Sequence, residues 1–352
     1  MSKTVNRQEV LRTLEAVSPG LSTREIIEQS GCFVFANGLV RTYNDLVSCS
    51  APSPFGKLVN GAVQAQGLLE LFRRLSEDDL IVSATDSEIQ LAGKGRRAGV
   101  RLEAQVVLPV DQVEAPMKWN PIHDSFGDAV GLVHLCAGTD ASMFSLTCVH
   151  VTPKWVEACD NYQMCRWRLK TGFTQNTLIR RDSVRHATGL GASEVSEGRA
   201  WVHFRNSEGI TLSCRATSEE YPDLSPFLKA DGGKAVLPKG LAEAAEKAGV
   251  FSADAVDEDN VLIDLRPGKL RIKGEGAIGW YEEVKRLFYD GPPLTFSIKP
   301  KLLIDIVTRH SSEASIGAKR LVVDGGPYTY SAVLRAPETK KKQKPDSEGE
   351  DE

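Results

Sequence analysis

The sequence predicts an α+β protein in which one domain is repeated three times, and each domain has two halves made of a helix and antiparallel strands. Three hairpin turns recur every 115 residues, at Asn37-Gly38, Thr152-Pro153 and Pro267-Gly268. A second set of turns lies between them at nearly the same spacing, at Asp86-Ser87-Glu88, Ser207-Glu208-Gly209 and Asp324-Gly325-Gly326. Each turn follows a segment with helical periodicity. Six such units in register predict an internal repeat.

The turns are predicted from the residues at their centres and the runs beside them. Gly, Asn and Pro supply the φ values that tight turns need, and short β-rich runs flank each turn. Cys32–Ala36 and Leu39–Thr42 flank the first turn, and Val261–Leu265 and Lys269–Lys273 flank the one at Pro267-Gly268. We therefore expect antiparallel hairpins at all six positions.

The helices are predicted from apolar residues at i, i+3, i+4 and i+7. They are expected at Arg7–Val17, Gln66–Leu75, Pro121–Leu135, Arg180–Thr188, Pro238–Ala248 and Ile298–His310. Pro121 and Pro238 stand where a first-turn proline is tolerated. Pro, Gly and charged residues interrupt the pattern near Val113–Lys118 and Leu228–Lys234, so the expected domains are 1–115, 116–230 and 231–336.

The last sixteen residues differ in composition from the rest of the chain. Pro337–Glu352 has four lysines, six acidic residues and no large apolar side chain. Such a segment cannot bury enough surface to offset its conformational entropy. The sequence therefore predicts a disordered charged tail at 337–352.

Composition excludes several classes of protein. With 352 residues, 41% hydrophobic and 26% charged, the chain is neither fibrous nor globally disordered. No apolar run approaches the roughly 18 residues that span a bilayer, and the start has no signal-peptide core, so we expect a cytoplasmic protein. Seven cysteines without a C-x-x-C pair argue against a disulfide framework. The net charge of -4 neither indicates nor excludes a nucleic-acid partner.

Sequence motifs give little support to catalysis, a metal or a cofactor. The six histidines show no H-E-x-x-H or comparable ligand spacing. Cys159, Cys165 and His150 could be drawn as a metal site, but no fourth ligand lies in register, and buried thiols on strands explain the cysteines better. Gly189-Leu-Gly-Ala lacks the lysine of a phosphate-binding loop. We expect a protein that is not an enzyme.

Two stretches of the middle domain resemble the bacterial and phage DNA polymerase sliding clamps. Trp155–Cys165 is similar to that family's strand ending in Ala-Thr-Asp-Gly-His-Arg-Leu-Ala, and Glu219–Leu228 to its Gly-Arg-Phe-Pro-Asp-Tyr segment. The layout agrees in the third domain at Val261–Lys273, Thr295–Arg309 and Tyr328–Arg335, and in the first at Leu39–Ser50 and Gly61–Leu75. The resemblance covers roughly residues 5–336.

The middle domain also departs from the family pattern. Cys159 stands for Thr, Asn161 for Gly, Tyr162 for His, Gln163 for Arg and Met164 for Leu. Asn is the non-glycine residue that best accepts a positive φ, so we expect the turn at Asn161 to be kept.

The resemblance implies a head-to-tail homodimer that forms a ring of six domains, with one chain as half of the ring. Strands would form the outer wall and the joints between subunits, and twelve helices would line the hole. The implied partners are double-stranded DNA, a replicative polymerase such as DNA polymerase III and a clamp loader. The implied function is processivity in DNA replication.

A clamp must hold DNA without reading its sequence, which requires Lys and Arg contacts to phosphates. The candidates on or near the predicted helices are Arg7, Arg12, Arg73, Arg74, Arg180, Arg181, Arg185, Lys299, Lys301 and Arg309. The six helical segments together carry a net charge of +3, counting Lys and Arg against Asp and Glu, whereas the whole chain carries -4. The alternative is that these residues are only the solvated faces of amphipathic helices.

The family also binds extended partner peptides in a pocket between its second and third domains. The positions that the resemblance assigns to this pocket are Leu146, Cys159, Asn161, Tyr162, Met164, Pro222, Phe227, Tyr330 and Ala332. Apolar walls suit peptide capture, and Met adapts its shape to different partners. The alternative is that Leu146, Met164 and Phe227 are plain core residues.

Two other interpretations remain open. The chain could be a repeat-built interaction scaffold that never binds DNA, which trapping on circular against linear DNA would distinguish from a clamp. The tail at 337–352 either screens the peptide pocket or contacts the loader, or it only keeps the protein in solution.

Overall fold

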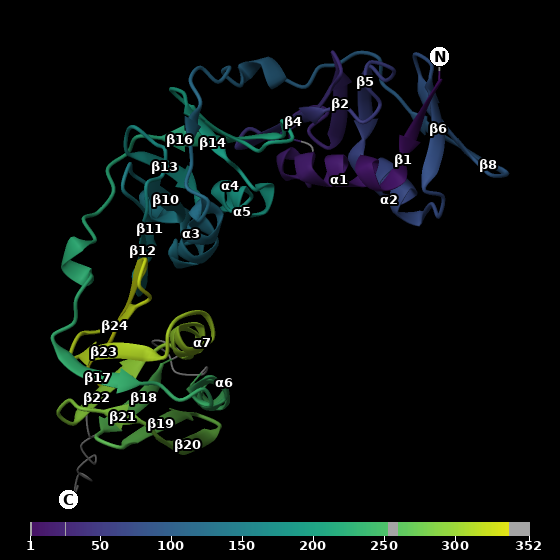
Figure 1. The fold of residues 1–352 in the computed structure, drawn as a ribbon. Coiled ribbons are helices and arrows are strands. Elements are labelled where there is room, and N and C mark those ends of the chain that lie inside the picture. Colours follow the sequence, from purple (N-terminus) through teal and green to yellow (C-terminus); the bar gives the residue numbers. More distant parts are fainter. Residues whose placement is uncertain (1, 25, 253–259, 338–352) are drawn as a thin grey trace, which may run out of the picture. The chain divides into compact units, whose positions relative to one another are not determined.

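The structure is a computed structural model of the chain, and it describes residues 2–24, 26–252 and 260–337 (Figure 1). The chain forms two compact units, Met1–Pro222 and Asp223–Glu352. The expected domains 1–115 and 116–230 fall in unit 1, apart from residues 223–230, and the expected domain 231–336 falls in unit 2. The three-domain division itself stays a prediction. The expected tail lies outside the described residues from 338 onward.

The first half of unit 1 has two antiparallel groups of strands and two helices. One sheet has the order β1-β6-β7-β8, with strands Ser2–Asn6, Asp79–Ala84, Glu88–Gly93 and Arg96–Arg101. The other group has the order β5-β2-β3-β4, with strands Gly61–Gln64, Cys32–Ala36, Leu39–Tyr43 and Val47–Pro52. Helices α1 (Arg7–Val17) and α2 (Ala65–Arg74) pack against each other.

The second half of unit 1 extends the group that ends at β4. The sheet continues in the order β4-β16-β15-β14-β9, with new strands Thr211–Thr217, Trp201–Arg205, Glu194–Glu197 and Asn120–Pro121. From β16 it also continues through β13, β10, β11 and β12, which are Thr177–Arg180, Cys148–Val151, Trp155–Cys159 and Gln163–Arg168. Its helices α3, α4 and α5 are Phe126–Val133, Arg181–Val184 and Ala187–Leu190.

Unit 2 has two antiparallel sheets and two helices. One sheet has the order β21-β17-β23-β24-β25, with strands Phe288–Tyr289, Gly232–Val236, Glu313–Gly317, Arg320–Asp324 and Tyr328–Val333. The other has the order β20-β19-β18-β22, with strands Gly279–Arg286, Lys269–Gly276, Val261–Arg266 and Leu294–Ile298. Helices α6 (Leu241–Ser252) and α7 (Pro300–Arg309) pack against each other.

Helix α6 lies very close to β19, which its small residues allow. Its buried face includes Ala244, Ala245 and Ala248. A Cβ atom on Gly274 of β19 would lie 1.9 Å from the carbonyl oxygen of Ala248, so only glycine fits there. The position of α6 is therefore fixed by small side chains on both elements.

Both predicted sets of turns are confirmed, and the local chemistry explains them. Asn37 and Gly38 join β2 to β3 with φ of 53° and 76°, the positive values that a tight hairpin turn requires. Helix α1 is also confirmed over its full predicted range. The Asn6 side chain accepts hydrogen bonds from the backbone N–H groups of Gln8 and Glu9, and Val10, Leu14 and Val17 are buried.

Two predicted helices begin later than expected, and one is split. Pro121 belongs to strand β9 at the sheet edge, where a residue without an N–H is tolerated, so helix α3 begins only at Phe126. Pro238 precedes α6, and its carbonyl accepts the N–H of Leu241. The predicted helix at 180–188 is instead two short helices, α4 and α5, and the second ends at Leu190 and is capped by Gly191 with a φ of 62°.

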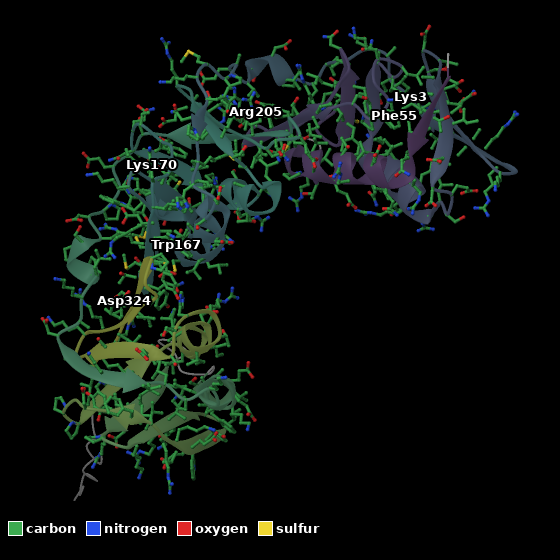
Figure 2. The ribbon with its side chains drawn as sticks, viewed as in Figure 1. Lys3, Phe55, Trp167, Lys170, Arg205 and Asp324 are labelled. Carbon is green, nitrogen blue, oxygen red and sulfur yellow. The ribbon has the colours of Figure 1, made fainter. Side chains whose placement is uncertain are left out.

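Aromatic side chains join the helices of unit 1 to its strands. Figure 2 labels Phe55 among the side chains of the first half of unit 1. Its ring lies 5.3 Å from that of Phe35 on β2 and 6.2 Å from that of Phe72 on α2, centre to centre. Tyr43 on β3 and Trp201 on β15 belong to a second buried cluster, and their ring centres are 6.2 Å apart. The first and second halves of unit 1 therefore share a core as well as a sheet.

A buried histidine on β15 should make unit 1 less stable in acid. His203 is 1% exposed, its Nδ1 lies 2.8 Å from Ser213 Oγ, and its Nε2 has no hydrogen-bond partner in the structure. Burial lowers the pKa of His203 to about 4, below the usual 6.5. The unfolded chain therefore binds more protons between these values, so stability is full above pH 6.5 and is lost as pH falls toward 4.

We expect a loss of about 2 kcal/mol of unfolding free energy between pH 7.5 and pH 5 from this residue. Urea unfolding of wild type and His203→Gln at both pH values measures it. His123, an exposed histidine before α3, provides the matched control as His123→Gln. An equal acid sensitivity in all three proteins would show that His203 is not the cause.

Candidate functional site

The ten predicted DNA-contacting cations all lie on helices or directly beside them. Arg7 and Arg12 are on α1, Arg73 and Arg74 on α2, Arg180, Arg181 and Arg185 at α4, and Lys299, Lys301 and Arg309 at α7. Helical periodicity therefore placed them correctly. Their contacts with DNA stay a prediction, and the structure separates those that are bound into the fold from those that face solvent.

Three of these arginines are half-buried against the fold of unit 1. Arg7 Nη1 donates a hydrogen bond of 3.3 Å to the carbonyl of Phe72, and Arg181 Nη1 donates one of 2.5 Å to the carbonyl of Ala137. The guanidinium of Arg180 lies 5.9 Å from the centre of the Phe144 ring. These side chains position α1 and α4, so changing them would perturb the fold as well as the surface charge.

The other unit 1 arginines of the set are exposed and carry weak ion pairs. Arg12 lies 3.2 Å from Glu208, Arg73 lies 2.8 Å from Glu15, and Arg74 lies 3.7 Å from Glu70. Arg185 is also exposed, and its Nε donates to the backbone carbonyl of Asp182. Exposed ion pairs contribute about 0–1 kcal/mol, so phosphates can displace them.

A cleft of about 450 Å³ brings together arginines from the two halves of unit 1. Arg12 of α1 lines it on one side, and Arg185 lines it on the other, before α5. Glu15 and Glu208 also line it. The sequence did not reveal these two glutamates as part of the site, because Glu208 is 196 residues from the arginine that it contacts.

In unit 2 the predicted cations stand at both ends of α7. Lys301 is exposed in the first turn, and Lys299 is half-buried at the N-cap. Arg309 in the last turn pairs with Asp305 at 2.9 Å, one helical turn earlier. The positive charge of Arg309 at this end of α7 is therefore balanced by the carboxylate of Asp305.

The predicted peptide-pocket residues of unit 1 surround one hairpin. Cys159 on β11 and Met164 on β12 face each other in the ladder, and both are buried. Between them Asn161 is exposed and Tyr162 is half-buried. Leu146 is half-buried in a 3₁₀ segment, Ala141–Thr147, and Pro222 is exposed.

The turn between β11 and β12 does not depend on a positive φ at Asn161, which was the conformation expected there. Positive φ values occur at three non-glycine residues of the described chain, Gln29, Asn37 and Asp45, and Asn161 is not among them. Instead, the carboxylate of Asp160 accepts hydrogen bonds from the N–H groups of Tyr162 at 2.7 Å and Gln163 at 2.9 Å. An aspartate side chain thus replaces the backbone conformation that glycine would supply.

The pocket candidates of unit 2 differ strongly in exposure. Phe227 is 40% exposed, and the guanidinium of Arg320 lies 4.9 Å from its ring centre. Tyr330 and Ala332 on β25 are fully buried, and the ring of His310 stacks on Tyr330 at 4.1 Å. The core interpretation therefore fits Met164 but not Phe227. The pocket as a whole stays a prediction.

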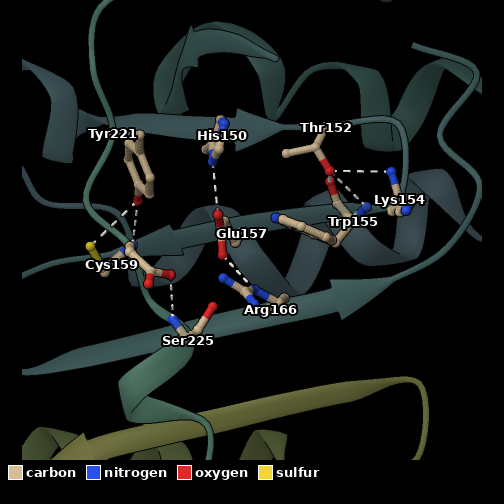
Figure 3. Close-up of polar contacts among 10 residues, drawn as sticks. His150, Thr152, Lys154, Trp155, Glu157, Cys159, Arg166, Tyr221 and Ser225 are labelled. Atoms are coloured by element: carbon tan, nitrogen blue, oxygen red, sulfur yellow. Dashed lines mark hydrogen bonds and ion pairs between the residues drawn. The ribbon is translucent and has the colours of Figure 1, made fainter. Parts of the chain in front are cut away.

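Sequence reasoning missed a buried polar array beside Cys159 (Figure 3). Glu157 is 2.8 Å from Nδ1 of His150 and 2.6 Å from Nε of Arg166. The guanidinium of Arg166 in turn lies 4.7 Å from the centre of the Trp155 ring. These side chains come from three neighbouring strands, β10, β11 and β12, and only the strand register brings them together.

Tyr221 connects this array to the segment after β16. Its ring lies 4.8 Å from that of His150, and its hydroxyl accepts the N–H of Cys159 at 2.9 Å. Burial raises the pKa of the Cys159 thiol, which makes it less reactive. His150 and Cys159 are therefore engaged in structural contacts, which argues against the metal site drawn from them with Cys165.

The described residues were searched for a metal centre and for a membrane-spanning helix. Among residues 2–24, 26–252 and 260–337, no group of His, Cys, Asp and Glu side chains is placed to hold a metal ion. No helix in the described part of the chain is long and apolar enough to cross a bilayer. All seven cysteines lie in the described part of the chain, and all are buried.

Comparison with known proteins finds matches among solved structures alone. No protein-family model and no curated protein sequence matches the chain. The sliding clamp DnaN of Pseudomonas aeruginosa, DNA polymerase III subunit beta, matches with a TM-score of 0.82 at 14% identity, over 96% of this chain and 100% of that chain. The beta subunit of Thermotoga maritima matches with a TM-score of 0.82 at 13% identity, over 96% and 100%.

A third structure agrees with these two. The beta subunit of the Streptococcus pyogenes DNA polymerase matches with a TM-score of 0.80 at 17% identity, over 96% of this chain and 100% of that chain. The fold that these proteins share is the one expected from the sequence resemblance, and that expectation is confirmed.

Proposed function

We propose that this chain, which has the fold of the bacterial sliding clamps over 96% of its length, is a DNA polymerase processivity clamp. Two copies would form a ring that encircles duplex DNA and tethers the replicative polymerase to it. The observation that carries the proposal is the group of exposed arginines, Arg12, Arg73, Arg74 and Arg185, on helices from both halves of unit 1.

The proposed mechanism is topological and needs no catalytic group. Arginine contacts to phosphates carry no sequence information, so the ring slides. A polymerase held on the ring stays at a high effective concentration near the primer end. We place the protein in the cytoplasm with the DNA, without a cofactor.

The ring requires a joint between two copies, and two edge strands support one. Strand β8 ends the sheet of unit 1 and exposes Arg96, Arg97 and Arg101. Strand β20 ends a sheet of unit 2 and exposes Glu282 and Arg286 beside Trp280 and Val284, which are 65% and 48% exposed. A basic unpaired edge and an unpaired edge that exposes a carboxylate between two apolar side chains suit a heterologous joint, which closes into a ring.

The polymerase and the clamp loader would dock through extended peptides on the predicted pocket. On unit 1, Asn161, Tyr162 and Leu146 provide partly exposed surface, and Met143 nearby is 44% exposed. Phe227 provides an exposed aromatic ring on unit 2. The charged tail at 337–352 is proposed as a further contact for the loader or as a screen for the pocket.

Trapping on DNA tests the proposal directly. After incubation with a clamp loader, ATP and DNA, the protein is expected to stay on a closed circle through gel filtration. It is expected to leave the same DNA once a restriction enzyme opens the circle, because a sliding ring runs off the end. Equal retention on both forms, or none on either, would favour the scaffold interpretation.

A further inference from the structure

Two of the exposed arginines of unit 1, Arg12 and Arg73, each have a glutamate partner that lines the cleft. Glu208 contacts Arg12 through a single pair of atoms at 3.2 Å. Glu15 accepts two hydrogen bonds from Arg73, from Nε at 3.2 Å and from Nη2 at 2.8 Å. Both glutamates line the cleft that Arg12 and Arg185 also line. Two cations and two anions therefore share one cleft.

The fold does not require these two carboxylates. The turn that carries Glu208 is made by Asn206, whose side-chain oxygen accepts the N–H groups of Glu208 and Ile210 at 3.1 and 2.9 Å. Glu15 lies in α1 between the buried residues Leu14 and Val17, and glutamine is as good a helix former at that position. The effect of Glu208 and Glu15 is therefore on the arginines that they contact.

The ion pairs are too exposed to add much stability. The side chains of Arg12 and Glu208 are 67% and 49% exposed, and those of Arg73 and Glu15 are 54% and 50% exposed. Pairs of this kind exchange readily for other anions. A phosphate entering the cleft competes with a carboxylate for each arginine and is repelled by that carboxylate when it succeeds.

We propose that Glu208 and Glu15 are built-in competitors of DNA phosphates, which hold the contacts of Arg12 and Arg73 with DNA weak and exchangeable. The inference rests on the proposed DNA binding. A sliding protein needs a cation surface that prevents escape without fixing its position. A glutamate next to each arginine supplies this, because the arginine returns to its carboxylate whenever a phosphate moves past.

The test compares Glu208→Gln with a matched change at Asp45. Asp45 also pairs with an arginine, Arg215, across the two halves of unit 1, its side chain is 56% exposed, and it does not line the cleft. Asn tolerates the positive φ of 73° at this position. Asp45→Asn therefore removes one negative charge and one ion pair between the same two halves, but away from the cleft.

The measurement is the affinity of the full-length protein for a short fluorescent DNA duplex over a range of salt concentrations. We expect Glu208→Gln to bind about two- to fivefold more tightly than wild type and to steepen the slope of log K against log salt by about 0.9, one more phosphate contact. Adding Glu15→Gln should repeat both effects. Asp45→Asn should change neither the slope nor the affinity beyond about 1.5-fold.

The outcomes separate this inference from the proposed function. If wild type binds DNA but Glu208→Gln behaves like Asp45→Asn, the competitor role is wrong and the clamp proposal stands. If wild type does not bind the duplex at any salt concentration, the inference is wrong, and the clamp proposal is then decided by trapping on the closed circle. If Glu208→Gln binds more tightly but the slope of log K against log salt is unchanged, the gain comes from the loss of a negative charge and not from a new phosphate contact. That result too would overturn the inference.

Discussion

Replacing Arg12, Arg73, Arg74 and Arg185 together by glutamine is expected to weaken binding to duplex DNA strongly at physiological salt and to slow loading onto circular DNA. These arginines are the exposed members of the predicted set in unit 1. Each phosphate contact contributes about 0.9 to the salt slope, so the quadruple variant should lose about 3 to 4 from the slope of log K. With about 1 kcal/mol lost per contact, we expect affinity for duplex DNA to fall by about 100-fold or more.

A control variant with the same change in net charge makes this result specific. Arg24, Arg168, Lys170 and Arg199 are exposed in unit 1 and lie outside its helices. Their replacement by glutamine removes four positive charges and is expected to leave the affinity for duplex DNA within about threefold of wild type, because salt screens distant charges. Equal losses in the two variants would mean that DNA senses total charge rather than the helix surface.

Arg180 and Arg181 are left unchanged in this design for a structural reason. Arg181 bonds the carbonyl of Ala137, and Arg180 lies over the Phe144 ring. Removing them would confuse a loss of DNA contact with a loss of local packing. Sequence periodicity could not make this distinction, because it assigns a residue to a helix but not to a bonding partner.

Features that depend on neighbouring residues could be predicted from the sequence. Asn37-Gly38 specifies a hairpin turn through its own backbone preferences, and Asn6 with the apolar spacing after it specifies α1. Pro121 misled the prediction because a proline suits both the first turn of a helix and an edge strand. Its pairing with β14, about seventy residues later, decided between them.

Features that depend on tertiary pairing could not be predicted. Glu208 meets Arg12 only because a turn after β15 lies over α1, and no local pattern marks that contact. Glu157, His150 and Arg166 form one array because of the register of three strands. The resemblance to a family pointed to Cys159 and Pro222, but it was silent on Tyr221 between the array and the pocket residues.

The second large effect is expected at the joint between copies. Reversing β8 with Arg96→Glu and Arg97→Glu should turn the wild-type dimer into a monomer, because the reversed strand meets the exposed Glu282 on β20 of the other copy. Reversing β20 with Glu282→Arg and Glu283→Arg should do the same. Like charges across an interface cost several kcal/mol, so each joint should weaken by about 100-fold or more.

A mixture of the two reversed proteins provides the decisive measurement, because a head-to-tail ring has two joints. In a mixed dimer, the acidic β8 of one copy faces the basic β20 of the other, and the unreversed strands face each other at the second joint. Sedimentation should therefore show monomers near 38.4 kDa for each variant alone and a dimer of twice that mass for the mixture.

Monomers in the mixture, with both variants folded, would place the joint on other strands. A dimer in either variant alone would mean that these charges do not govern assembly. Loss of stability in the single variants cannot explain a dimer restored by mixing, since each partner carries its own two reversed charges into the restored ring.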